Sequence, residues 1–337
     1  SLSQACTVTL APNTLSNVWV VQNSAGNTVT LTQGTGANVV IPNGGIRMVA
    51  TDGAGSGAAV TDVLDVLGGT GNVGLGSGAL GTGLTTGTDN VAIGHDAGDA
   101  LTSGSDNVFI GDAAGSATTT ASNNVGVGSE ALAVNTTGAN NTAVGALSLD
   151  ANTTADSNTG LGYAALTANT TGAGGTAVGT NALLSLTTGN ENTAVGFNAL
   201  DAATTGAVNT AVGAYALSAV TTAANNTGIG YSALLANTAA NNTAVGSNAL
   251  AANTTGTRNV AFGYAALDAN TTASYNSAFG TFSLSDNTTG ANNTGLGYYA
   301  LAVNTTASDN TAVGYQALGA NTSGTRNTAT GRSALTT

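Results

Sequence analysis

From Asn72 onward the chain consists of copies of one short repeat, and the constant length of this repeat restricts the fold more than any other feature of the sequence. Thirteen of the fifteen steps between successive copies span seventeen positions, the first step is one position longer, and the step from Asn226 to Asn242 is one position shorter. A fixed short period is typical of solenoids, in which each repeat packs only against its neighbours. The anchors of the sixteen copies are Asn72, Asn90, Asn107, Asn124, Asn141, Asn158, Gly175, Asn192, Asn209, Asn226, Asn242, Asn259, Asn276, Asn293, Asn310 and Asn327.

Within each copy, three further positions are nearly constant when counted from the anchor as position 0. Position +4 is Gly in all sixteen copies, position +3 is Val, Ile, Leu or Phe in fifteen, and position +8 is Leu in fourteen. From Leu132 onward, position +12 is always Thr. An invariable Gly predicts a backbone with positive φ or a close approach of the next coil. The apolar residues at +3 and +8 are expected to form the core.

The short, Gly-rich unit predicts an all-β fold, namely a parallel β-solenoid or β-roll of about sixteen 17-residue repeats. An α-solenoid needs about 30 to 45 residues per repeat, and Gly and Thr are poor helix formers. We expect two short strands per coil, around the motifs NTAVG and ALxANTT. Identical Asn and Thr side chains in stacked coils are expected to form hydrogen-bonded ladders.

The segment before the repeats, residues 1–57, predicts a small antiparallel β module. Five β-branched, alternating runs are separated by Asn, Pro and Gly turns. They cover residues 7–10, 17–22, 27–33, 38–42 and 46–50. Residues 58–71 are expected to be a neck or linker, either a strand or two turns of helix, and residues 72–337 the repeat shaft.

Each coil has few large apolar side chains to bury, commonly one Val, one Leu and one or two Ala. Ordering the backbone of a whole repeat has a high entropic cost that so thin a core offsets only in part. We therefore expect lateral association with copies of the same chain, most simply as a homotrimer.

The charge of the chain excludes several kinds of partner. It has 16 Asp or Glu residues, four Arg and no Lys, for a net charge of −12. Such a surface cannot neutralise a nucleic-acid backbone or an anionic membrane surface. No run of about 18 apolar residues occurs, so we also expect no membrane insertion.

The single histidine, His95, lies beside Asp96 and near Asp99, an arrangement compatible with an acid–base dyad or a metal ligand. We expect a structural or surface role instead, because neighbours in a strand point to opposite faces and no second His is present. The early repeats also concentrate five carboxylates, which could bind Ca²⁺ but more often form turns. These are Asp89, Asp96, Asp99, Asp106 and Asp112. We predict no metal site and no cofactor.

No catalytic arrangement is apparent. Glycoside hydrolysis requires two carboxylates on the facing walls of a cleft. Asp150, Asp201 and Asp268 recur at position +9, but they belong to coils several repeats apart. We therefore predict that the chain is not an enzyme.

The most promising binding residues are aromatic and stand at position +5, mostly in alternate repeats. Stacked coils would place them in one column with rings about 10 Å apart, where they could stack on sugar rings. The alternative is that they shield a strand edge or line an interface between chains. The six residues are Tyr163, Phe197, Tyr231, Tyr264, Tyr298 and Tyr315.

The repeat resembles those of known adhesive fibres. The stretch NTAVGSNALAANTTGTRNVAFGYAAL at 242–267 is similar to the head repeats of trimeric autotransporter adhesins, which are parallel β-rolls. It is still more similar to the NTAVGYxALxxNTTG arrays of bacteriophage tail fibres, and residues 18–53 resemble a small β module of tail-fibre and receptor-binding proteins.

This resemblance implies a homotrimeric tail fibre on the virion that adheres to a host cell-surface receptor or glycan and joins other fibre or baseplate proteins. A bacterial cell-surface adhesin head is the first alternative. A structural filament subunit and an ice-binding solenoid are further alternatives. Against ice binding, the two Thr of the NTT motif are adjacent and so face opposite sides of a strand.

Overall fold

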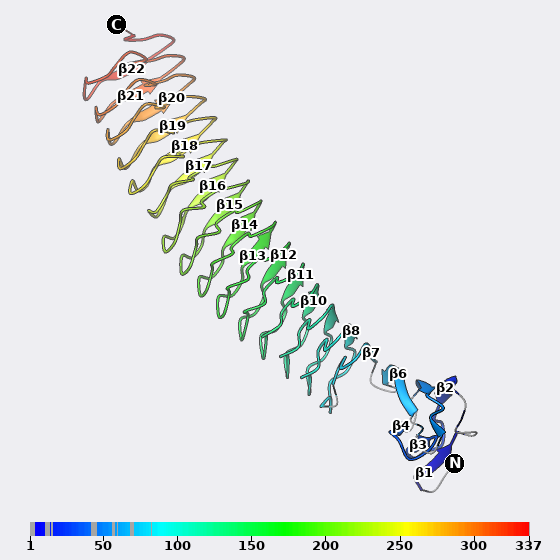
Figure 1. The fold of residues 1–337 in the computed structure, drawn as a ribbon. Helices are drawn as coiled ribbons and strands as arrows, with labels where there is room; N and C mark the ends of the chain where they lie inside the picture. The colour runs from blue at the N-terminus through cyan, green and yellow to red at the C-terminus, as the bar shows by residue number, and fades with distance from the viewer. Residues whose placement is uncertain are drawn as a thin grey trace. The chain divides into compact units, whose positions relative to one another are not determined.

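The computed structural model describes residues 4–10, 14, 16–41, 46–55, 58, 60–67, 71–81 and 83–336. All regular secondary-structure elements in these residues are β-strands, joined by turns and loops. Sixteen parallel strands, β7–β22, form a β-solenoid, and a small separate sheet precedes them (Figure 1). The chain divides into two compact units, Ser1–Asn140 with β1–β10 and Asn141–Thr337 with β11–β22. The predicted fold class is confirmed.

All five predicted strands of the small module are present. They are β1 (Cys6–Thr9), β2 (Val18–Gln22), β3 (Val29–Thr32), β4 (Val39–Ile41) and β5 (Ile46–Thr51). The pairs β3–β4 and β2–β5 are antiparallel, as expected. The pair β1–β3 is parallel instead, because the intervening β2 pairs with β5 rather than with β1. The buried core of the module includes Leu31, Ile41 and Val49.

The expected neck contains a strand rather than a helix. Strand β6 (Val60–Leu67) pairs antiparallel with β5 and also with β7 (Asn72–Leu75), the first strand of the solenoid. The edge of β7 is therefore hydrogen-bonded to β6, which satisfies backbone groups that an open sheet edge would expose.

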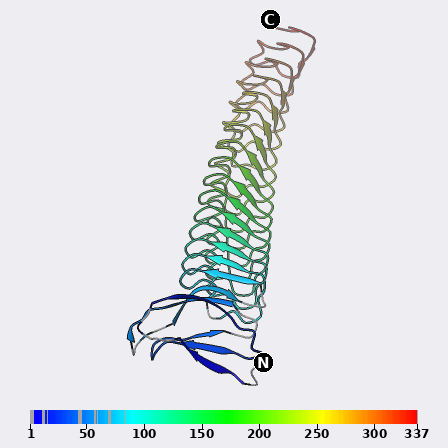
Figure 2. The same cartoon turned by 90° about the vertical axis from the view of Figure 1, so that its right-hand side faces the viewer.

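Each later coil contributes one strand of three residues, at positions +1 to +3. Within each unit, neighbouring strands pair in parallel with a constant register, as in Thr193↔Thr210 and Val195↔Val212 (Figure 2). The strands are β8 (Val91–Ile93), β9 (Val108–Ile110), β10 (Val125–Val127), β11 (Thr142–Val144), β12 (Thr159–Leu161), β13 (Thr176–Val178), β14 (Thr193–Val195), β15 (Thr210–Val212), β16 (Thr227–Ile229), β17 (Thr243–Val245), β18 (Val260–Phe262), β19 (Ser277–Phe279), β20 (Thr294–Leu296), β21 (Thr311–Val313) and β22 (Thr328–Thr330).

The apolar residue at +3 faces outward, so the expectation that it belongs to the core is wrong. Successive side chains of a strand alternate between its two faces. Position +2, which is Ala in most coils, points inward and is fully buried, as at Ala194 and Ala278. Positions +1 and +3 therefore share the outer face, where Leu161 is 46% exposed and Leu296 47%.

The expected second strand is also wrong, because positions +5 to +10 form turns in the coils from Asn90 to Asn310. Positions +6 and +8 adopt positive φ, for example 56° at Leu166 and 50° at Leu250. The side chain at +8 is nevertheless buried, as expected. Backbone bonds still join adjacent coils in this half, because the Leu166 N–H donates to the Ala182 carbonyl oxygen at 3.0 Å.

Two coils lack Leu at +8, and one aromatic side chain explains both. Phe109 occupies an inward +2 position and is fully buried. Gly98 and Gly115 stand at +8 on either side of it, and a Cβ on Gly98 would lie 3.0 Å from Cδ2 of Phe109. The phenyl ring thus takes the space that Leu fills elsewhere.

The glycines at +4 have the geometry that the sequence predicts. Their φ angles lie between 123° and 140°, values that L side chains rarely adopt. The next coil also leaves no room for a side chain. A Cβ on Gly162 would lie 2.6 Å from the carbonyl oxygen of Gly179.

Buried asparagine ladders join the coils from the inside, as predicted. The backbone N–H of Asn276 donates to Oδ1 of Asn259 at 3.0 Å, and Oδ1 of Asn276 accepts from the backbone N–H of Asn293 at 2.9 Å. A second ladder at position +11 links Nδ2 of Asn287 to Oδ1 of Asn270 at 3.1 Å. Because buried amides must be paired, both ladders fix the vertical register.

The predicted threonine ladder at +12 is also present. Oγ1 of Thr170 donates to the carbonyl oxygen of Thr187 at 3.1 Å, and Oγ1 of Thr187 donates to that of Thr204 at 3.0 Å. The bonds thus run from hydroxyl to backbone, so each Thr supports the main chain of the next coil.

Loops absorb the two irregular repeat lengths. In the longer first copy, the N–H of Leu80 and the N–H of Thr85 donate to Ala97 and Thr102, so the extra residue lies between Leu80 and Thr85. In the shorter copy, the bond from Thr238 to Thr254 places the missing residue after Thr238. The register of the strands and of the anchors is unaffected.

Candidate functional site

All six aromatic residues predicted at +5 lie in the second unit, in the turn that follows the strand. Each directly follows the +4 glycine, whose positive φ turns the chain out of the sheet. All six side chains are exposed, from 43% at Tyr315 to 56% at Tyr231. They are therefore available to a ligand or to another chain.

Aromatic residues at +6 in neighbouring coils fill the gaps between them. The ring centroids of Phe197 and Tyr215 are 5.4 Å apart, and those of Tyr215 and Tyr231 are 6.1 Å apart, both in edge-to-face geometry. Adjacent rings are therefore closer than the expected spacing of about 10 Å. We name Phe197, Tyr215 and Tyr231 the first ring run.

A second ring run occupies four consecutive coils near the C-terminal end. Its members are Tyr264, Phe282, Tyr298, Tyr299 and Tyr315, with centroid separations of 5.3 Å for Tyr264–Phe282, 5.0 Å for Phe282–Tyr299, 4.4 Å for Tyr298–Tyr299 and 5.5 Å for Tyr298–Tyr315. The guanidinium carbon of Arg332 lies 5.5 Å from the Tyr315 centroid, within the range of a cation–π contact.

The packing of these rings changes the acidity of one phenol. Desolvation by its surroundings raises the pKa of Tyr298 above 10.0, and the neighbouring hydroxyls of Tyr299 and Tyr315 raise it further.

Position +5 alone missed three members of these runs, Tyr215, Phe282 and Tyr299. Each stands at +6 in a coil next to one with an aromatic residue at +5. This adjacency in the sequence could have identified the three residues as members of the runs. Tyr163 is different, since the coils on either side of it have no aromatic residue at +5 or +6.

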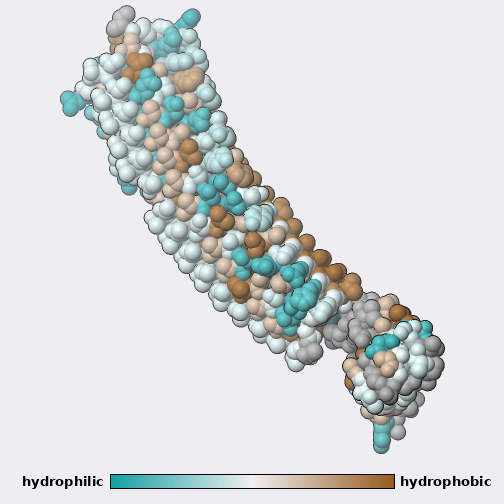
Figure 3. All heavy atoms as spheres, viewed as in Figure 1, coloured by the Kyte–Doolittle hydropathy of each residue, from teal (hydrophilic) through white to brown (hydrophobic). Residues whose placement is uncertain are grey.

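In each unit, the outer face of the sheet carries exposed apolar residues at position +3. The most exposed are Leu75 and Ile93 in the first unit, and Leu161, Ile229, Phe262, Phe279 and Leu296 in the second. The rings of Phe262 and Phe279 stack with centroids 6.4 Å apart. Figure 3 shows hydrophobic residues recurring from coil to coil along one edge of the coils. We name the apolar +3 residues of the second unit the outer apolar column.

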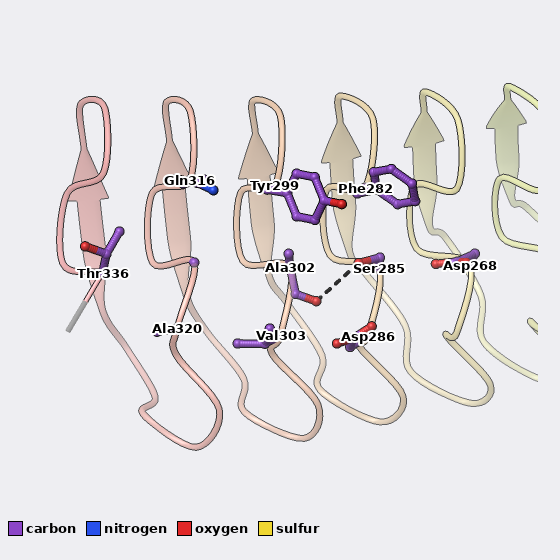
Figure 4. A pocket seen from close by; sticks show the side chains of 11 residues that line it. Asp268, Phe282, Ser285, Asp286, Tyr299, Ala302, Val303, Gln316, Ala320 and Thr336 are labelled. Atoms are coloured by element: carbon purple, nitrogen blue, oxygen red, sulfur yellow. Dashed lines mark hydrogen bonds between the residues drawn. The ribbon is translucent and has the colours of Figure 1, made fainter.

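A groove lies beside the second ring run, with a volume of about 490 Å³. Figure 4 shows three rows of side chains along it: Phe282, Tyr299 and Gln316 at +6, Asp268, Ser285 and Ala302 at +9, and Asp286, Val303 and Ala320 at +10. Ser285 serves the scaffold, because its Oγ donates to the Ala302 carbonyl oxygen at 3.3 Å.

The carboxylates at +9 are partly desolvated. Oδ1 of Asp201 and Oδ1 of Asp268 are buried and have no hydrogen-bond partner among the described residues. Burial raises the pKa of both carboxyl groups, although backbone N–H groups that contact each carboxylate lower the pKa in part, and the nearby Asp286 raises the pKa of Asp268 further. These two acids lie in separate coils, as the sequence predicted, and make no common site.

His95 contacts two carboxylates, although we expected Asp96 to point away from it. Its Nδ1 lies 3.2 Å from an oxygen of Asp96 and 3.2 Å from an oxygen of Asp112. The expectation is wrong because both residues lie in a turn after β8, where strand alternation does not apply. The His95 side chain is 64% exposed, and polar contacts at such exposed positions contribute little to stability.

The early carboxylates occupy turn positions. Asp89, Asp96 and Asp106 have φ angles between 51° and 59°, a conformation that Asp tolerates better than most residues. Within the described part of the chain, no three His, Cys, Asp or Glu residues are grouped as a metal site. The local role of Asp89, Asp96 and Asp106 is thus turn formation.

Comparison with known protein families, curated proteins and solved structures finds no match to this chain. In the residues that the structure describes, no helix has the length and hydropathy needed to cross a membrane.

Proposed function

We propose that the chain is the shaft and receptor-recognition segment of a homotrimeric bacteriophage tail fibre, which adheres to glycans on a host cell surface. The observation that carries this proposal is the pair of exposed ring runs on a regular, sparsely charged scaffold. Aromatic faces bind the C–H faces of sugars, and several rings in a row suit an extended glycan. The tail-fibre setting rests on the resemblance of the repeats.

The outer apolar column supports self-association. Its residues recur once per coil, so a partner that matches it along its length must have the same period. A further copy of this chain meets that condition. Exposed apolar patches of such extent are uncommon on monomers, and three chains packed through these columns would remove them from water.

The recognition surface and the interface between chains occupy different positions in this arrangement. The column stands at +3 on the strand, whereas the ring runs stand at +5 and +6, beyond the +4 glycine turn. This separation favours ligand binding over the alternative that the +5 rings line the interface.

Ring substitutions test the proposal. The double variants Tyr215→Ala/Tyr231→Ala and Tyr264→Ala/Tyr298→Ala each remove part of one ring run, and Tyr163→Ala removes an isolated ring as the matched control. We expect weaker binding to immobilised bacterial surface polysaccharides for the two double variants, with the sedimentation coefficient unchanged. Unchanged binding would refute glycan recognition by the runs, and loss of association would place the rings in the interface.

Ice binding is a second candidate, favoured by one specific observation. The outer face carries a row of Thr at +1, such as Thr176, Thr193 and Thr210, beside the apolar row at +3. Thr at +1 and Val at +3 are separated by one inward-pointing Ala, so both face the same side of the strand. The two adjacent Thr of the NTT motif would face opposite sides. Thermal hysteresis of the purified chain would support this candidate, and its absence would exclude it.

A bacterial adhesin head is the alternative, since it would also use the ring runs to bind glycans and the outer apolar column to associate with other copies of the chain. Detection of the chain in purified phage particles would support the tail-fibre setting. Detection on bacterial cells free of phage would support the adhesin instead.

A further inference from the structure

We propose that the groove beside the second ring run binds a pyranose without an acidic group, either a neutral or an amino sugar. The inference rests on the proposed glycan recognition and adds the site and the ligand class. It is drawn from the groove bounded by Phe282, Tyr299, Asp268, Asp286 and Gln316 (Figure 4).

The local sequence explains why the groove forms there. Phe282 and Tyr299 are large residues at +6 in successive coils, and they form one wall. The next row, at +9, is small in the coils that face them, with Ser285, Ala302 and Gly319. The difference in side-chain size between the two rows leaves a depression of about 490 Å³, within the range of about 300–1,000 Å³ of small-ligand sites.

The ring wall supplies an apolar contact surface. The centroids of Phe282 and Tyr299 lie 5.0 Å apart with 34° between the ring planes, so the pair presents a tilted and continuous surface rather than two separate rings. Both side chains are half-buried by their neighbours, which limits the conformational entropy lost on binding. Such a wall suits the C–H face of a pyranose.

The polar residues of the groove select hydrogen-bond donors. Asp268 lines the groove with a half-buried carboxylate, and an ionised carboxylate oxygen only accepts hydrogen bonds. Asp286 is exposed on the row below and accepts as well. Gln316 adds an amide, which both donates and accepts. The hydroxyls or the ammonium group of a sugar satisfy these acceptors.

The same charges exclude acidic sugars. The groove lining contains two Asp and neither Lys nor Arg, and the whole chain carries a net charge of −12. A uronic or sialic acid would place a carboxylate beside two others without a cation to compensate. Like charges at such distances repel, and desolvation strengthens the effect.

The test measures binding of simple methyl glycosides to the purified 337-residue chain by saturation-transfer NMR. The probes are methyl glucoside, methyl galactoside and methyl glucosaminide, with methyl glucuronide as the acidic counterpart. We expect at least one of the first three to bind about tenfold more tightly than the glucuronide. Equal or tighter binding of the glucuronide, or no binding of any probe, would overturn the proposal.

Variants assign the binding to the groove. Phe282→Ala/Tyr299→Ala should abolish it, and Asp286→Asn should reduce discrimination against the glucuronide. Tyr231→Ala and Asp201→Asn are matched controls, because they alter a ring and a carboxylate outside the groove, and they should bind as the unmodified chain does. Binding that survives Phe282→Ala/Tyr299→Ala would refute the groove site.

This experiment separates the two proposals. Polysaccharide binding that depends on Tyr215 and Tyr231 but not on the groove variants would leave the proposed function intact and contradict the groove. Glycoside binding in the groove without any binding to surface polysaccharides would contradict the proposed function instead.

Discussion

At the scale of single residues, the fold depends on the glycine at position +4 of each coil. The +4 glycine meets two separate demands, a strongly positive φ angle and contact with the main chain of the next coil. Gly314 and Gly331 separate these demands, because their φ angles are similar, 132° and 123°, and their surroundings differ. A Cβ on Gly314 would lie 2.7 Å from the carbonyl carbon of Gly331, whereas a Cβ on Gly331 would have nothing within 4 Å.

Gly314→Ala should therefore destabilise the chain far more than Gly331→Ala. Both substitutions incur the cost of a positive φ, about 1–2 kcal/mol for an L residue, but only the first forces two coils apart. The free energy of unfolding from urea titration measures the difference. Equal losses for the two variants would show that the φ angle alone requires Gly.

The carboxylate at 201 makes stability depend on pH. Burial raises the pKa of Asp201 in the folded chain above the ordinary value of 3.8, so folding favours the protonated form. This contribution to stability is fully present below pH 3.8 and is lost as pH rises through the folded pKa. Asp201→Asn should thus raise stability at neutral pH relative to the unmodified chain, and less at a pH below the ordinary pKa of Asp.

Thermal unfolding at the two pH values measures this effect. A stabilisation of Asp201→Asn that is the same in acid and at neutral pH would contradict the assigned pKa direction.

At the scale of strands and turns, the sequence predicts half of each coil. The β-branched residues at +1 and +3 identify the strand, and the invariable Gly identifies the bend after it. The turn at +6 to +8 could not be predicted, because it places Leu at positive φ against its local preference. Burial of the Leu side chain and bonds to the next coil overcome that preference, and both are properties of the stack.

The sequence also does not predict which face of the strand is buried. A three-residue strand with Thr, Ala and Val has apolar residues on both faces, so its sequence does not show which face is buried. Ala is buried because adjacent coils leave room for only a small residue at +2, except where Gly98 and Gly115 admit Phe109. The ring runs were predicted in part, since their +6 members depend on how neighbouring coils stack.

Phe262→Thr/Phe279→Thr should weaken self-association without unfolding the chain. Both rings stand in the outer apolar column, and Thr occupies the same position at Thr330, so the strand accepts it. We expect a rise in the dissociation constant of at least about tenfold, measured by sedimentation equilibrium. Phe197→Thr, which changes an exposed ring outside the column, is the control, and equal effects of the two changes would contradict the role of the column.

At the scale of the whole molecule, coils behave as nearly interchangeable units, since each pairs only with its neighbours. Deletion of residues 243–259 removes one full period and joins Asn242 to Val260 in the usual register. The chain should remain folded. Its free energy of unfolding, and the dependence of that free energy on urea concentration, should fall roughly in proportion to the one coil removed. Circular dichroism and urea titration measure this.

Deletion of residues 243–250 is the control, because it breaks the register of anchors and ladders and should disrupt the solenoid. If both deletions were tolerated equally, the asparagine and threonine ladders would not determine the register.

Sedimentation equilibrium of the unmodified chain measures self-association through the outer apolar column. One chain has a mass of 32.0 kDa. We predict a stable species of three chains at micromolar concentration, converted toward smaller species by Phe262→Thr/Phe279→Thr. A stable monomer with its outer apolar column exposed to water would contradict it.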